Sequence, residues 1–499
     1  MRNKIFGILL MLEAAFMLLA SLVALYYNIK LGETDFTCLL YPSLGTGVIG
    51  FVLLLIGRSQ NKPLRAKDSF LIVTLAWVLY SLFGMVPFML YGTVTNVADA
   101  FFETMSGFTT TGATVLSNID SQPHGILFWR SLLQWLGGLG IIVFSLAFFS
   151  SVAGQSKKMF LFSAEASGLS VEKLHPTMQG TARDLWLIYL ALTISCMICY
   201  WIGPMSFYDA LCHSLTTIST GGYSTHQSSI GYFQSSYIEY VAVFFMIASG
   251  ANFSIYYFLL TKRFAMAWRN KELKTYLLVF IAASAFIATM FIITPSLSDI
   301  PDQQLEATPK GVGDSIRTAM FHVASIFSST GYQAQWFDYD KWGIAVIIPT
   351  VLLMICGACT GSTTGGIKII RVMICRRQIQ NAFKRFLHPT AYFSLKIQGQ
   401  VISFDIVRRV FVFMFLYLIL YFVSIVLLTL VGMGFDDASF AYFTCFSNCG
   451  PGLRSTGPAN NFANVPDLGK WLLSIIMLIG RLEIFTVLVL FTKGFWKSK

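Results

Sequence analysis

Four short stretches that end in glycine recur along this chain at nearly constant intervals. In each of them mostly small polar residues lead into the glycine: TTTG at residues 109–112, ISTG at 218–221, SSTG at 328–331 and SNCG at 447–450. From glycine to glycine the intervals are 109, 110 and 119 residues. Four copies of one motif predict a unit that is placed four times around a common axis. Because glycine permits backbone angles that other residues adopt only at a cost, such stretches can line a narrow polar passage.

The composition places this fourfold unit in a membrane. Hydrophobic residues make up 55% of the 499 and charged residues only 12%, whereas about 25% of the residues of a soluble domain are charged. Stretches of roughly 20 apolar residues can cross the hydrocarbon layer, and we expect ten crossings, at residues 5–26, 36–56, 70–90, 126–149, 185–202, 237–260, 276–293, 343–374, 404–431 and 468–491. The first two precede the repeats, and each later pair brackets one glycine stretch. The first is too long for a secretory leader, so we predict that it is retained.

Positive charge alternates between successive loops. Lysine and arginine gather after the second, fourth, sixth and eighth spans and at the C-terminus, whereas the loops with the glycine stretches are poorer in both. By the positive-inside rule the basic loops and both termini are cytoplasmic. The net charge of +11 is therefore a topology signal, and no nucleic-acid partner is expected. Contact with anionic lipid or an acidic cytosolic protein is the alternative explanation.

Each outward segment repeats a second signal before its glycine. Asp99, Asp209, Thr318 and Asp437 stand 12 or 13 residues before the glycines and are followed by about ten apolar residues. Asp and Thr are good N-caps, so a short re-entrant helix is predicted to begin at each of them. The predicted fold is an all-α integral membrane protein of about ten spans, in which a helix, a pore helix, a filter strand and a helix occur four times.

This organisation divides the chain into five parts. We expect an N-terminal two-helix domain at residues 1–66 and pore repeats at 67–154, 155–265, 266–390 and 391–499. In a filter, oxygen ligands replace the water shell of a cation, and rings of backbone carbonyls do this for potassium. The candidate filter residues are Thr110, Thr111, Gly112, Ser219, Thr220, Gly221, Ser329, Thr330, Gly331, Asn448, Cys449 and Gly450. Cys449 lacks the hydroxyl of its counterparts, so that quadrant must rely on carbonyls alone. Ordinary Gly/Ser/Thr loops are the alternative, but four at matched offsets argue against it.

These segments resemble the filters of the TrkH/KtrB superfamily of potassium transporters. The resemblance rests on FFETMSGFTTTGAT at residues 101–114, STGGYS at 219–224, STGY at 329–332 and NCGPG at 448–452. It covers the whole chain, and the two extra N-terminal spans favour the TrkH branch. Glycine at position 112, where serine is associated with sodium permeation in this superfamily, favours potassium.

The resemblance implies a potassium-uptake subunit of the bacterial inner membrane. It further implies a homodimer and a cytosolic TrkA-type ring regulator of the nucleotide-binding RCK kind, with the nucleotide on the regulator and potassium as the only metal at the site. A sodium-permeable or ion-coupled member, with potassium–sodium or potassium–proton symport, is the alternative. A polytopic membrane enzyme would need a cluster of His, Asp or Glu at one membrane face, and the sequence offers none, so no catalytic residues are predicted.

Two features interrupt the predicted spans. The eighth contains Gly357, Gly361, Ser362, Thr363, Thr364, Gly365 and Gly366, a composition that suits a lipid-facing helix poorly. It resembles the intramembrane gating loop of the superfamily, and a close-packing small-residue helix is the alternative. A phosphate-binding loop is rejected because Ile367 stands where its lysine must be.

Arg481 lies within the last span, where a charge faces a cavity or a partner. The resemblance makes it an electrostatic barrier beneath the filter, and a salt bridge to another helix is the alternative. Glu103, His213 and His322 occupy matching places in the first three pore helices and are candidates for holding the filter by hydrogen bonds. Glu13, midway along the first span, receives no role from the sequence.

Overall fold

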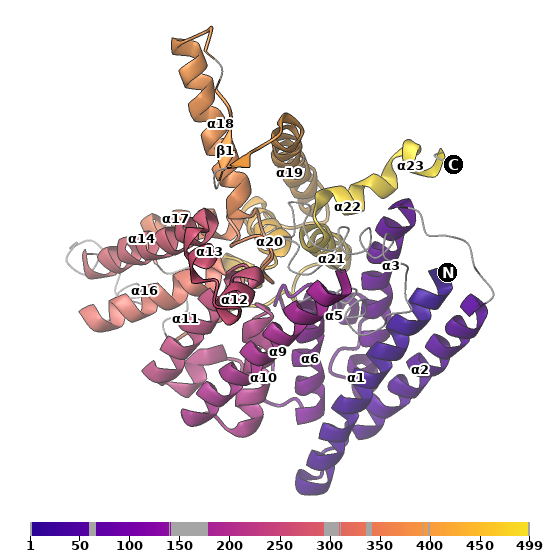
Figure 1. Ribbon diagram of the computed structural model, residues 1–499. Coiled ribbons are helices and arrows are strands. Elements are labelled where there is room, and N and C mark those ends of the chain that lie inside the picture. The colour runs from indigo at the N-terminus through magenta and orange to yellow at the C-terminus, as the bar shows by residue number, and fades with distance from the viewer. Residues whose placement is uncertain are drawn as a thin grey trace.

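The computed structural model describes residues 2–58, 66–138, 178–293, 311–335, 342–391, 393–397 and 400–497, together with residues 140 and 309. The described chain is mainly helical, with helices arranged around a central region (Figure 1). One antiparallel pair of two-residue strands, β1 (Lys396–Ile397) and β2 (Gln400–Val401), is also present.

An N-terminal hairpin lies at one side of the molecule (Figure 1). It consists of α1 (Arg2–Leu31) and α2 (Phe36–Arg58). The two helices approach closely because glycines face the contact: a Cβ atom on Gly7 would lie only 2.6 Å from the carbonyl oxygen of Gly50. Tyr80 of the next helix donates to the Leu9 carbonyl oxygen of α1 at 2.7 Å. This hydrogen bond ties the hairpin to the first repeat.

Four further groups of elements follow in chain order. The first comprises α3 (Ala66–Gly84), α4 (Val86–Tyr91), α5 (Val97–Phe108) and α6 (His124–Gly138). The second comprises α9 (Met178–Ile202), α10 (Phe207–Ile218), η1 (Ser229–Phe233), α11 (Ser236–Gly250), α12 (Phe253–Leu260) and α13 (Phe264–Arg269). The third comprises α14 (Lys271–Ile293), α16 (Val312–Phe327), α17 (Ile344–Ile355) and α18 (Ile369–Leu387), followed by β1 and β2. The fourth comprises α19 (Phe404–Leu430), α20 (Phe435–Ser447), η4 (Arg454–Thr456), α21 (Asp467–Leu482), α22 (Ile484–Leu488), η5 (Val489–Phe491) and α23 (Lys493–Lys497).

The four short helices α5, α10, α16 and α20 are largely buried, and each ends where a glycine stretch begins. We call them the pore helices. The expected N-caps were wrong by three or more residues, because the caps are Asn96, Ser206, Gly311 and Gly434. Asp99, Asp209 and Asp437 lie instead in the first turn, where the positive end of the helix dipole stabilises a carboxylate. Thr318 lies well inside α16, because this helix has 16 residues where α5 has 12.

The expected number of ten spans is not confirmed by the described residues. Six helices are long and apolar enough to cross a membrane, or up to eight if two bent pairs each count as one span. The bends are 95° between α11 and α12 and 116° between α21 and α22. The predicted span 343–374 is split into α17 and α18. The predicted span 126–149 is helical up to Gly138, and its later part lies largely outside the described residues.

In each group, the helix that begins the second predicted span ends before the end of that span. α6 ends at Gly138, α11 at Gly250, α17 at Ile355 and α21 at Leu482. Local chemistry explains two of these ends. Asn252 starts α12 by accepting a hydrogen bond from the Ser254 amide at 2.8 Å, and Glu483 adopts φ 63° and ψ 151°, which no helix accommodates.

Candidate ion pathway

The four glycine stretches share one backbone conformation. The left-handed region is occupied by Thr110, Thr220, Ser329 and Asn448, with φ of 54°, 55°, 53° and 50°. Two residues later it is occupied again by Gly112, Gly222, Gly331 and Gly450, with φ of 81°, 78°, 79° and 95°. Non-glycine residues rarely adopt a positive φ, so the same strained turn has been built four times.

This conformation changes the alignment of the second stretch. The sequence spacing pairs Gly221 with Gly112, whereas the backbone angles pair Gly222 with Gly112. Gly221 is therefore equivalent to Thr111, Thr330 and Cys449, and it occupies the central position of its stretch. The sequence alone could not show which of these two adjacent glycines is equivalent to Gly112, because either one keeps the nearly constant interval between the stretches.

The four stretches close into a ring. A Cβ atom added to Gly112 would overlap the carbonyl oxygen of Gly221, and one added to Gly222 would overlap that of Thr330. In the same way Gly331 faces the carbonyl oxygen of Cys449, and a Cβ on Gly450 would lie 2.8 Å from that of Thr111. Each stretch thus packs against the next, and the fourth packs against the first. We call these four glycines and the four residues before them the glycine ring.

Side chains support the central position differently in each repeat. The Thr111 hydroxyl is 2.7 Å from that of Thr109, and the Thr330 hydroxyl is 2.6 Å from that of Ser328. The Cys449 sulfur makes a longer contact, 3.8 Å from the Ile326 carbonyl oxygen.

At Gly221 the missing side chain is replaced by Gln134 of α6. Its Nε2 donates to the Gly221 carbonyl oxygen at 2.6 Å, and its Oε1 accepts from the Tyr223 amide at 3.0 Å. A Cβ on Gly221 would meet this amide group. Gln134 is fully buried, so the first repeat supplies the side chain that holds the second stretch.

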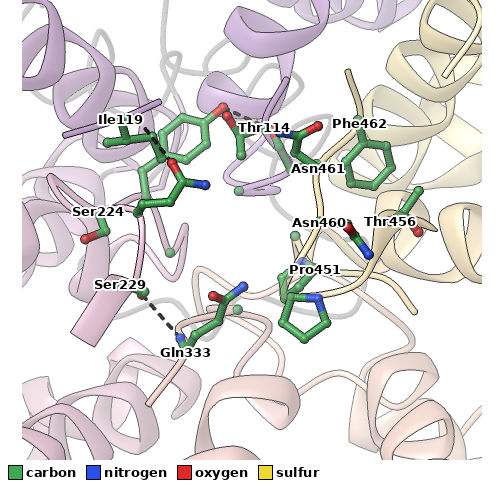
Figure 2. A pocket seen from close by; sticks show the side chains of 18 of the residues that line it. Thr114, Ile119, Ser224, Ser229, Gln333, Pro451, Thr456, Asn460, Asn461 and Phe462 are labelled. Carbon is green, nitrogen blue, oxygen red and sulfur yellow. Dashed lines mark hydrogen bonds between the residues drawn. The ribbon is translucent and has the colours of Figure 1, made fainter. Parts of the chain in front are cut away.

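A cavity, which we call the outer cavity after the side that the charge pattern predicts, opens onto the glycine ring. It encloses about 550 Å³, part of it open to solvent, and all four ring glycines line it. Figure 2 shows polar side chains from all four groups around an open centre, including Thr114, Ser224, Gln333 and Asn460. The backbone N–H of Gln333 donates to the Ser229 hydroxyl at 3.2 Å. This hydrogen bond joins the third group to the second. A hydrated cation could therefore reach the ring from this side.

A second set of side chains lies behind the ring. Glu103 accepts from the Val115 amide at 2.9 Å and from Arg130 at 2.7 Å, and His213 is 2.9 Å from the Ser224 hydroxyl. Both side chains thus contact residues that stand two or three positions after a ring glycine. His322 instead pairs with Thr350 of α17 at 2.8 Å.

Sequence reasoning missed Arg130 and Gln134. Arg130 is buried, pairs with Glu103, and lies over the Tyr223 ring at 3.5 Å. The available signal was their spacing: two polar residues four positions apart lie on one face of a helix. They interrupt an otherwise apolar predicted span, and in the structure both face the glycine stretches.

The segment between α17 and α18 folds back under the ring. We call residues 356–368 the intramembrane loop. It contains all the predicted gate residues: Gly357, Gly361, Ser362, Thr363, Thr364, Gly365 and Gly366. The loop is not helical, and Cys356 and Ile367 at its two ends form an isolated β-bridge. A continuous small-residue helix, the alternative considered for this segment, is therefore wrong.

The intramembrane loop contacts the left-handed residues of two glycine stretches. The Thr220 hydroxyl donates to that of Thr363 at 3.2 Å, and the Gly365 amide donates to the Ser329 hydroxyl at 3.0 Å. A Cβ on Gly365 would also overlap the Ser447 carbonyl oxygen at the end of α20. The loop thus lies at the opposite end of the stretches from the outer cavity.

Arg481 completes this layer. Its guanidinium donates to the carbonyl oxygens of Gly137, at 2.6 Å, and of Gly138 and Thr363, and to the Thr110 hydroxyl at 3.2 Å. These contacts join the first, third and fourth groups. A positive charge therefore stands directly beside the first stretch.

The loop is anchored to neighbouring helices. Glu272 of α14 accepts from the Thr360 amide at 2.7 Å and from the Thr360 hydroxyl at 2.9 Å. Beyond the loop, Arg371 of α18 pairs with Glu483 at the bend between α21 and α22. Within the described residues, no group of three or more His, Cys, Asp or Glu side chains could hold a metal ion.

Comparison with known proteins agrees with this arrangement. Residues 46–498 match the family model described as TrkH, cation transport protein. The chain is 36% identical over 503 residues to the Trk system potassium uptake protein TrkH of Salmonella typhimurium, covering 99% of both chains. It is 34% identical over 498 residues to the Trk system potassium uptake protein TrkG of Escherichia coli, covering 99% of this chain and 97% of that protein. The crystal structure of the potassium transporter TrkH from Vibrio parahaemolyticus superimposes with a TM-score of 0.86 at 31% identity, over 99% of both chains.

Proposed function

The chain belongs to the TrkH family of cation transport proteins, and we propose that it admits potassium through the glycine ring. Members of the family are ion transporters and not enzymes. Relatives named as Trk potassium uptake proteins support potassium uptake as its function, in the bacterial inner membrane. We further propose that both termini are cytoplasmic, as the charge pattern of the loops predicts.

The observation that carries this proposal is the closure of four equivalent backbone turns into one ring. Carbonyl groups in such a ring can replace the hydration shell of potassium. The pore helices end at the ring, and the C-terminal end of each carries roughly half a negative charge. Four such ends attract a cation to one point. An inside-negative potential adds about 2.3 kcal/mol per charge per 100 mV in the inward direction.

We assign the intramembrane loop and Arg481 to gating. The loop contacts the left-handed residues of the second and third stretches, and Arg481 contacts that of the first. An ion leaving the ring toward the cytoplasm meets this layer, so the layer must move. Helix α18 follows the loop and projects away from the helical body (Figure 1), which suits it to transmit movement from a cytosolic regulator. That regulator is proposed to be a TrkA-type nucleotide-binding ring, and the transporter a homodimer.

A sodium-permeable or ion-coupled transporter is the second candidate. Gly112 distinguishes the candidates: with φ of 81° and its Cβ direction blocked by Gly221, a serine there must move the neighbouring carbonyl. We expect Gly112→Ser to lower the preference for potassium over sodium. An unchanged preference would contradict the assignment of the glycine ring as the filter.

Growth tests the function directly. A bacterium that lacks its own potassium-uptake systems should grow on low potassium when it expresses this chain with its regulator. Gly313→Ala is the matched control, because a Cβ at Gly313 meets no atom within 4 Å, and it should also restore growth. If the wild-type protein is present in the membrane and growth is not restored, potassium uptake is the wrong function.

A further inference from the structure

Glu13 is a buried carboxyl group that the proposed ion pathway does not use. It lies midway along α1, in the N-terminal hairpin and outside the four groups that form the glycine ring. Its side chain is fully buried, with an exposed fraction of 0%. Within the described part of the chain, neither carboxyl oxygen has a hydrogen-bond partner. A charged side chain within a membrane span costs free energy, so an ionisable residue there indicates a functional site.

The carboxyl group lies against the first pore helix. Its Oε1 is 3.2 Å from the position that a Cβ on Gly84 would take, and Thr104 Cγ2 and Phe108 Cε2 are each 3.0 Å from the same position. Gly84 ends α3, and its lack of a side chain leaves room for the carboxyl group. Glu13 therefore contacts the site where α1, α3 and α5 meet.

The polar groups beside Glu13 are already used as donors. The Thr104 hydroxyl donates to the Ala100 carbonyl oxygen at 2.8 Å, and Trp129 donates to the Gly84 carbonyl oxygen at 3.1 Å. A carboxylate needs donors and these groups offer it none, whereas a protonated carboxylic acid carries no charge that requires them. The local chemistry thus suits the acid form.

Electrostatics favour the same form. Glu13 is fully buried, and no charged side chain faces it from the described residues of α2, α3, α5 or α6. The C-terminal end of α5, at Phe108, carries partial negative charge and repels a carboxylate. A buried charge without a counter-charge is unfavourable, so Glu13 holds a proton when the helices are packed as described.

We propose that Glu13 is a proton-binding site whose protonation state controls the packing of the first pore helix. Loss of the proton to water leaves a carboxylate against Phe108, the last residue of α5 before residues 109–112 of the first stretch. The carboxylate must then draw in water or move away, and either change displaces α5. The ligand is a proton, and Glu13 is not among the residues that line the outer cavity.

The first experiment measures proton binding without transport. Infrared difference spectra of the purified full-length protein in lipid are recorded between about pH 6 and about pH 9, a range that spans the titration of buried glutamates. We expect the band of a protonated carboxylic acid to be lost as the pH rises and to be missing from Glu13→Gln at every pH. If the wild-type and Glu13→Gln spectra coincide, Glu13 binds no exchangeable proton and the proposal is wrong.

The second experiment measures the link to the pore and rests on the proposed potassium uptake. Rubidium-tracer uptake into proteoliposomes is measured over the same pH range. The wild type should lose uptake several-fold toward alkaline pH, and Glu13→Gln, which stays neutral, should keep it. Asp68→Asn is the matched control: Asp68 lies in the first turn of α3 near Arg2, and its loss should leave the wild-type profile unchanged.

The outcomes separate the two proposals. A Glu13→Gln profile that follows the wild type refutes the link between Glu13 and the pore. If Glu13→Gln does not fold, Glu13→Asp takes its place, because it keeps a titratable carboxyl on a shorter side chain. Its acid band and its loss of uptake should then shift together to a new pH, and shifts that do not coincide refute the link. If the wild type transports no potassium at any pH, the proposed function fails, while the spectra still decide whether Glu13 binds a proton.

Discussion

Replacing Gln134 tests whether one repeat supports the filter of the next. Gln134→Ala removes the donor to the Gly221 carbonyl oxygen and the acceptor for the Tyr223 amide. Both backbone groups are buried, and each unsatisfied group costs about 1–3 kcal/mol, so the second stretch loses roughly 2–6 kcal/mol of support. If about 1.4 kcal/mol of this reaches the ion site, the preference for potassium over sodium falls roughly tenfold.

The assay is rubidium-tracer uptake into proteoliposomes with sodium as competitor, together with thermal unfolding of the same preparations. Gln122→Ala is the matched control, because Gln122 makes its hydrogen bond to Asn118 in an exposed loop. It should leave both measurements unchanged. If Gln134→Ala keeps the selectivity and the unfolding temperature of the wild type, the reasoning from unsatisfied backbone groups is refuted.

A second substitution should partly restore the lost support. Gly221→Ser in the Gln134→Ala background supplies a hydroxyl at the central position and removes the clash with the glutamine. That hydroxyl can pair with Ser219, as Thr111 pairs with Thr109. We expect the double variant to be more selective than Gln134→Ala, with a coupling of about 0.5–3 kcal/mol between the two sites. Strictly additive losses would contradict this pairing.

Three further predictions concern other parts of the pathway. Gly222→Ala should abolish uptake, because its Cβ would overlap the Thr330 carbonyl oxygen and its φ of 78° strains any other residue; restored growth on low potassium would contradict this. Arg481→Gln should raise tracer uptake in the absence of a regulator, since it removes the charge beside the first stretch, whereas unchanged uptake would show that the arginine is no barrier. Partial burial disfavours a charged His226, but the neighbouring carboxylates of Asp209 and Asp120 outweigh it and raise the pKa of this imidazole above its ordinary value. The resulting stabilisation is fully present below about pH 6.5 and is lost as the pH rises through the raised pKa. His226→Gln should therefore lower the unfolding temperature more at acidic than at alkaline pH. An equal effect at both would refute the stabilising role of the charged imidazole.

The sequence was most informative where the signal repeats. Long apolar helices such as α1, α14 and α19 were predicted within a few residues, because an apolar run of membrane length has few alternatives. The pore helices were predicted as elements, but their starts were misplaced. Asp99 and Thr318 are good cap residues in general, yet Asn96 and Gly311 occupy the cap positions, and the difference depends on where the preceding chain enters.

Helix bends and tertiary contacts could not be predicted. A hydropathy pattern that continues through Glu483 gives no sign of a 116° bend, because the bend depends on the positive φ of that residue and on its pairing with Arg371. Gln134 and Arg130 were visible only as polar residues in an apolar run. Their partners lie in the second repeat and in the first pore helix, and only the fold brings these together.

The interlocking of the glycine ring constrains how such a chain can change. Each ring glycine borders a carbonyl oxygen that belongs to a different repeat, more than a hundred positions away in the sequence. A side chain introduced at a glycine of one quadrant therefore clashes with the backbone of the next quadrant. If that backbone moves, it displaces the quadrant that follows. The lipid-facing surfaces of the four repeats are free to diverge, whereas the ring positions can change only in concert. A tetrameric channel assembled from identical subunits acquires such changes in all four quadrants through one mutation, and this single chain would need four.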